Sequence, residues 1–129
     1  MKKIGLIGGI SWESTREYYR IINQLIQAKL GGSHSAEILM WSFDFGKVEK
    51  KQATGDWNGL TKDMVSAANK LKSAGADFFV ICANTMHKMA PAIARETGMD
   101  VLHIADVTGE AIKAQGLRKV TLLGTKYVM

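Results

Sequence analysis

The order of the apolar segments constrains the fold of this chain more than any other feature. Short, continuous apolar runs alternate with longer segments whose apolar residues recur with helical spacing. Strands that alternate with helices of this length predict βαβ units and a parallel sheet. The strand runs are apolar throughout, as expected for a sheet covered on both faces. We predict strands at 4–7, 37–43, 77–82, 101–104 and 120–123, and helices at 14–29, 56–74, 85–97 and 107–115.

This pattern predicts a three-layer α/β/α sandwich with a parallel, flavodoxin-like sheet of about four to five strands, whose order stays open. The 129 residues suit one domain, and a hydrophobic share of 47% excludes a disordered chain. The 17 Lys and Arg against 12 Asp and Glu are scattered, which favours an ordinary basic surface over a nucleic-acid interface. No apolar segment is long enough to span a membrane. A single cysteine excludes an internal disulfide and indicates a reducing compartment, so we expect a soluble cytoplasmic protein.

A glycine-rich turn, Gly8-Gly9, follows the first predicted strand and precedes a helix. The spacing is not that of the dinucleotide-binding motif Gly-x-Gly-x-x-Gly, and Asp44 is a weak candidate for the acidic residue that binds a ribose. The turn still presents backbone N–H groups beside the hydroxyl of Ser11, which suits a carboxylate as well as a phosphate. Alternatively, the turn needs glycine for its geometry alone.

A second turn carries more chemistry. The apolar run 78–81 leads directly to Cys82, and Asn84, Thr85 and His87 follow. Ligands bind outside the carboxyl ends of parallel strands. There a thiolate can act as the base for a carbon acid, while an amide and a hydroxyl hold a carboxylate. Alternatively, Cys82 packs as a small apolar residue. The three histidines (His34, His87 and His103) show no metal-ligand spacing with the cysteine, so we predict no metal site.

Three stretches together resemble the aspartate/glutamate racemase family, in its branch of broad-specificity amino-acid racemases. They are residues 8–15 with Tyr18-Tyr19 following, residues 81–87, and residues 122–127. The resemblance implies a cofactor-independent enzyme with two similar α/β domains and an active site between them. Two residues, commonly both cysteines, would flank the substrate α-carbon, one removing the α-proton and the other returning a proton. The substrate-binding residues implied by the resemblance are Ser11, Gln52, Asn84, Thr85, Met86 and Thr125.

The chain departs from the family pattern in two ways. The family motif commonly reads Cys-Asn-Thr, whereas here Ala83 precedes Asn84 and Cys82 lies one residue further back. A one-residue offset on a strand points a side chain to the opposite face, so Cys82 is a candidate base and Ala83 the alternative occupant of the catalytic position. Nothing in the chain corresponds to the second domain or its cysteine. We therefore expect residues 1–129 to be the N-terminal domain of a two-domain racemase. We expect this chain to lack the second domain and to be inactive by itself.

Three functions follow as hypotheses. The first is racemisation of an amino acid by two-base α-proton transfer, with this chain supplying half of the site. The second is a catalytically inactive α/β domain that binds a carboxylate or amino acid, which Ala83 favours. The third is a flavodoxin-like nucleotide binder. Expected partners are an amino acid or dicarboxylate and a second copy in a homodimer. Which amino acid is the substrate stays open. Apolar side chains near the mouth of the cleft, Trp12, Trp41 and Met86, are candidates for exposed apolar surface.

Overall fold

The computed structural model describes residues 1–128 and contains a parallel four-stranded sheet in the order β2-β1-β3-β4. The predicted α/β fold with a parallel sheet is confirmed. The elements are β1 (Ile4–Gly8), α1 (Trp12–Leu30), β2 (Ile38–Ser42), α2 (Phe45–Thr54), α3 (Trp57–Ser73), β3 (Phe78–Ile81), the short 3-10 helix η1 (Thr85–Met89), α4 (Ala90–Thr97), β4 (Val101–Leu102) and α5 (Ile104–Ala114).

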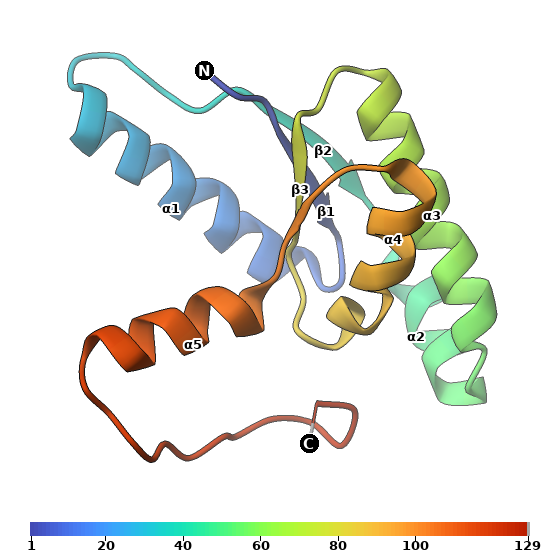
Figure 1. Ribbon diagram of the computed structural model, residues 1–129. Coiled ribbons are helices and arrows are strands. Elements are labelled where there is room, and N and C mark those ends of the chain that lie inside the picture. Colours follow the sequence, from blue (N-terminus) through green and yellow to red (C-terminus); the bar gives the residue numbers. More distant parts are fainter. Residues whose placement is uncertain (129) are drawn as a thin grey trace.

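Helices lie on both sides of the sheet. Helix α1 lies on one side of the strands, and α3 and α4 lie on the other (Figure 1). The inner strand β1 pairs with β2 and with β3, and its Leu6 and Ile7 are fully buried although they point to opposite faces. Because β1 and β3 are adjacent, the turns that follow them meet at one edge of the sheet.

The main core lies between the sheet and α3. The helical spacing within 56–74 predicts one inner face, and all five of its residues are buried: Leu60, Met64, Ala67, Ala68 and Leu71. All of them except Ala67 pack in one cluster with Ile7 of β1 and with Phe79 and Ile81 of β3. Asp56 begins the helix, and its carboxylate accepts a hydrogen bond from the Gly59 N–H at 2.9 Å.

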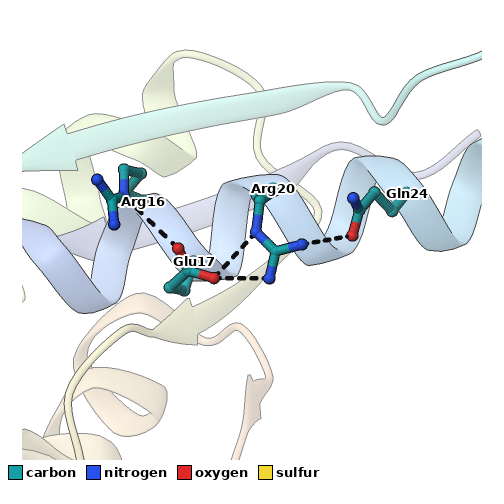
Figure 2. Close-up of polar contacts among 4 residues, drawn as sticks. All are labelled: Arg16, Glu17, Arg20 and Gln24. Carbon is teal, nitrogen blue, oxygen red and sulfur yellow. Dashed lines mark hydrogen bonds and ion pairs between the residues drawn. The ribbon is translucent and has the colours of Figure 1, made fainter.

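Helix α1 buries fewer of its side chains than α3 does. Thr15 is its one buried residue, while Ile21 and Leu25 are 43% and 64% exposed. Its solvent face carries a polar ladder, shown in Figure 2, in which Arg20 donates to Glu17 at 2.7 and 2.9 Å and to Gln24 at 2.8 Å. Contacts three and four residues apart stabilise a helix locally. This ladder helps α1 to form although little of its apolar face is buried.

Two sequence-based assignments differ from the structure. Residues 120–123 form no strand; within residues 1–128 no segment pairs with them, and Leu123 is 86% exposed. An apolar run becomes a strand only where a neighbour supplies backbone hydrogen bonds, and the outer strand β4 offers only two residues. Conversely, α2 was missed because Val48 is its one buried residue and leaves no apolar stripe. The residues at its two ends could have predicted it. Asp44 caps the helix by accepting a hydrogen bond from the Gly46 N–H at 3.1 Å, and Gly55 ends it at φ +71°.

No helix in the described part of the chain combines the length and apolar character needed to cross a membrane.

Candidate functional site

A cleft of 520 Å³ lies at the carboxyl ends of β1 and β3. Its walls come from the turn after β1, the turn after β3, helix α2 and residues 124–128. It brings together most of the residues that the sequence selected: Ser11, Gln52, Cys82, Ala83, Asn84, Thr85 and Thr125. These residues are separated by up to 114 positions along the chain, so the fold is what assembles them.

The turn after β1 requires its glycine. Gly9 has φ +81°, and a Cβ atom there would stand 2.4 Å from the backbone N and O of Phe43. The Gly9 N–H donates to the Thr15 hydroxyl at 2.9 Å, and that hydroxyl donates to the Ser11 carbonyl at 3.1 Å. The turn is therefore fixed from inside α1, and geometry alone accounts for this glycine.

Ser11 occupies the N-cap position of α1, but its side chain makes no capping hydrogen bond. The pKa of the Glu13 carboxyl in the first turn is lowered, with the Ser11 hydroxyl as the largest cause. The same hydroxyl is chemically suited to a carboxylate of a small ligand.

Ser14 joins the two turns. Its hydroxyl lies 2.7 Å from the carbonyl oxygen of Cys82 and 3.1 Å from that of Ser11, and both carbonyls accept from it. The bond to Cys82 spans 68 positions in sequence. This contact depends on β3 lying beside β1 and could not be read from the sequence.

Cys82 follows β3 with its side chain fully buried. Burial raises the pKa of its thiol to about 12, which disfavours the thiolate. Tyr18 of α1 lies near it, and the pKa of this phenol is raised by its own burial and by Cys82. The environment of Cys82 matches that of a buried apolar residue, although the residue also borders the cleft.

Ala83 is half-buried, lines the cleft and packs against the core beneath α3. Its methyl group can neither accept nor donate a proton. Cys82 therefore has an ionisable group, but its burial disfavours the thiolate. Ala83 lines the cleft and has no group that can transfer a proton.

The structure places Met86 in the core, fully buried, rather than at the cleft as the sequence reasoning expected. It is the second residue of the 3-10 helix, and its side chain packs in the main core. Trp12 is exposed, as expected, whereas Trp41 is half-buried with the Lys70 ammonium 4.3 Å from its ring centroid.

His87 lies in the 3-10 helix that follows the turn after β3 and is 6% exposed. Its Nδ1 lies 2.9 Å from the carbonyl oxygen of Ala83 and 3.2 Å from that of Asn84. Its ring is therefore buried and in contact with two successive carbonyl oxygens of the turn.

A larger hollow of 760 Å³ lies elsewhere, between α3 and α4, away from the strand ends. Its rim carries Lys62, Lys70 and Arg95, but none of the residues selected from the sequence. Among residues 1–128, no three His, Cys, Asp or Glu side chains gather closely enough to hold a metal ion. Asp44, the candidate ribose ligand, is engaged as the cap of α2. The strand-end cleft is therefore the candidate site.

Residues 7–128 match the family described as Asp/Glu/Hydantoin racemase. With its parallel sheet and a polar cleft at the strand ends, the chain belongs to this family.

Two crystal structures of homologues resemble it closely. One is a protein from Yersinia pestis described as an Asp/Glu racemase candidate, 54% identical, with a TM-score of 0.94 over 98% of this chain. The other is an aspartate racemase homologue from Pyrococcus horikoshii OT3, 36% identical, with a TM-score of 0.87 over 99% of this chain. The chain spans 55% and 56% of their respective lengths.

Proposed function

We propose that this chain supplies one half of a cofactor-independent amino-acid racemisation site and that residues 1–129 are the N-terminal domain of a two-domain racemase. One observation carries the proposal: neutral polar side chains of Ser11, Asn84 and Thr85 converge on a single 520 Å³ cleft. Membership of the racemase family and the fraction of each homologue that the chain covers support it.

In this proposal the substrate carboxylate lies against Asn84 and Thr85, with Ser11 across the cleft. Amide and hydroxyl groups can donate to a carboxylate without adding a charge to the site. When the α-proton leaves, negative charge spreads from the α-carbon onto that carboxylate, and fixed donors stabilise it. Gln52 and Thr125 line the same cleft and are the candidates for contacting the rest of the substrate.

Racemisation needs a base on one face of the α-carbon and an acid on the other. Within this chain, Ala83 offers no such group, and the Cys82 thiol, with a pKa raised to about 12, is a poor base near neutral pH. The chain therefore supplies at most one of the two groups, and we propose that it turns over little or no substrate alone.

The same observation favours a second candidate function. A domain that keeps the carboxylate-binding residues but has Ala83 at the cleft would bind an amino acid or dicarboxylate without racemising it. The cleft is retained in either case, and the difference lies in whether Cys82 ever exchanges a proton with the ligand.

Proton exchange separates the two. L- and D-aspartate, and a panel of other amino acids, are incubated with the chain in deuterium oxide, and loss of the α-proton signal is followed by NMR. Exchange that Cys82→Ala abolishes would establish the thiol as a base. Binding without exchange favours the binding function for this chain, and repeating the assay with a two-domain protein tests whether a second domain restores turnover. Absence of both binding and exchange contradicts the proposed site.

Self-association is also part of the proposal. The apolar residues Ile21 and Leu25 of α1 are exposed, and such surface favours a second copy. We infer a homodimer, which sedimentation velocity tests directly, with Leu25→Ser expected to shift the population toward monomer. We also propose a cytoplasmic location, supported by the lone, reduced cysteine.

A further inference from the structure

We propose that His87 is a positioning residue, whose neutral imidazole holds the turn of Ala83 and Asn84 in the conformation that presents Asn84 and Thr85 to the cleft. This inference rests on the proposed function only for what the turn binds. The geometry of the turn is independent of it.

The hydrogen bonds fix the tautomer of His87. Both atoms facing its Nδ1 are carbonyl oxygens, at 2.9 Å on Ala83 and 3.2 Å on Asn84, and carbonyls only accept. Nδ1 therefore carries the proton. In the neutral ring Nε2 then carries the lone pair, and it is buried with no hydrogen-bond partner among residues 1–128. One N–H thus serves two successive carbonyls of the turn, while the other side of the ring is closed to water.

His103 lies against this ring, with the two ring centroids 4.6 Å apart and an interplanar angle of 57°. It precedes α5, and its Nδ1 accepts a hydrogen bond from the Ala105 N–H at 3.2 Å as the cap of that helix. Its Nδ1 must therefore be unprotonated for the cap to exist. The two rings thus form the contact between the site turn and the start of α5.

A second proton on His87 would have to sit on Nε2, where there is no acceptor and where the second imidazole is close. Burial accordingly lowers the pKa of His87, and proximity to His103 lowers it further, while the two carbonyls partly oppose this. Among the described residues, His103 is the one titratable group that contributes a charge effect at His87. Because the folded pKa lies below the unfolded value of 6.5, neutral His87 contributes fully above that pH, and its contribution falls as pH falls below it.

Two substitutions separate positioning from packing. In His87→Asn, the side-chain amide nitrogen sits two bonds beyond Cβ, as Nδ1 does, so the donor stays but cannot titrate. His87→Leu fills much of the space without a donor. His34→Asn is the matched control, because His34 is exposed and lies far along the chain.

The readout is hydrogen exchange by NMR at the backbone amide of residue 87, which donates to the Asn84 carbonyl at 3.1 Å. The Cys82 amide, which donates to Ile7 at 2.9 Å, reports on the sheet beside it. Near neutral pH we expect His87→Leu to reduce protection at residue 87 by about tenfold, and His87→Asn to restore most of it. Between pH 7 and 5, protection at residue 87 should decline in the wild type and in His34→Asn but stay flat in His87→Asn.

Unchanged protection in His87→Leu, or equal loss in both His87 variants, would overturn the proposal. Titration of each variant with L-aspartate is a separate arm. If the wild-type chain binds no L-aspartate, the proposed function fails while the exchange data still decide the role of His87. If it binds, we expect weaker binding in His87→Leu and recovery in His87→Asn.

Discussion

The environment of Cys82 makes a quantitative prediction about its reactivity. Alkylating reagents react with the thiolate, whose population depends on pKa. Burial raises the pKa of this thiol from 9.0 to about 12. A shift of that size lowers the thiolate fraction near neutral pH by about 1,000-fold, from about 3% to about 0.003% near pH 7.5.

The expected result is slow alkylation of Cys82 by iodoacetamide, more than about tenfold slower than an exposed thiol before steric protection is counted, because the higher nucleophilicity of a high-pKa thiolate offsets only part of the roughly 1,000-fold loss. Because so little thiolate is present, the rate should rise about tenfold per pH unit up to the point where the protein unfolds. Full burial of the side chain adds a further requirement for local opening, which slows the reaction more.

The assay follows mass addition over time by mass spectrometry. The reference thiol is Ser33→Cys in a Cys82→Ala background, since Ser33 is exposed in the loop between α1 and β2. The wild type and this reference have one cysteine each, so intact mass reports each site separately. Melting curves at each pH confirm that the chain is folded during the reaction.

Reaction of Cys82 at a rate within about tenfold of the reference near neutral pH would refute this reasoning. Protection of such a fast thiol by L-aspartate would place a reactive group in the cleft and revive Cys82 as a base. A slow rate that L-aspartate does not change fits a structural cysteine.

Three further predictions concern the turns and the helix ends. Gly9→Ala should destabilise by more than about 2 kcal/mol in urea unfolding, since both a positive φ and a backbone clash oppose the methyl group. Gly55→Ala, with a similar φ of +71° but open space, should cost about 1 kcal/mol, and equal losses would show that the clash is relieved. Asp56→Ala removes the cap of α3 and should cost about 1 kcal/mol, whereas exposed Asp100→Ala should cost little; equal effects would mean that the cap contributes nothing. Asn84→Ala should weaken L-aspartate binding by about tenfold or more with an unchanged melting temperature, and unaltered affinity would remove Asn84 from the proposed site.

Where local pattern and tertiary environment agree, the sequence predicted the structure. The apolar stripe on α3 faces the largest buried surface in the chain, so helical periodicity identified every buried residue of that face. The apolar run at 78–81 became β3 because it lies between β1 and β4. Residues 120–123 look similar in sequence, but no strand among residues 1–128 lies beside them. Periodicity describes a segment and carries no information about its neighbours.

The candidate site shows the same limit at the level of single residues. The sequence placed Cys82 and Ala83 at the end of a strand but left open which of them meets the cleft. In the structure both residues line the cleft, with Tyr18 near Cys82 and with Ala83 packed against the core. Ser14 was likewise recognisable as a polar residue in the first turn of α1. Its bond to Cys82 exists only because β3 adds directly to β1.

The adjacency of β1 and β3 also sets when the cleft can form during folding. Ile4 pairs with Phe78, and the Ser14 hydrogen bond closes a loop of similar length. Closing such a long loop costs conformational entropy before the contacts contribute any stability, so we expect these contacts to form late. In a nascent chain, β1, α1 and β2 can form before β3 is available. The two turns that line the cleft come together only when β3 pairs with β1. We therefore expect the cleft to form late in folding, and a ligand of the cleft to stabilise the folded domain without speeding the early stages of its folding.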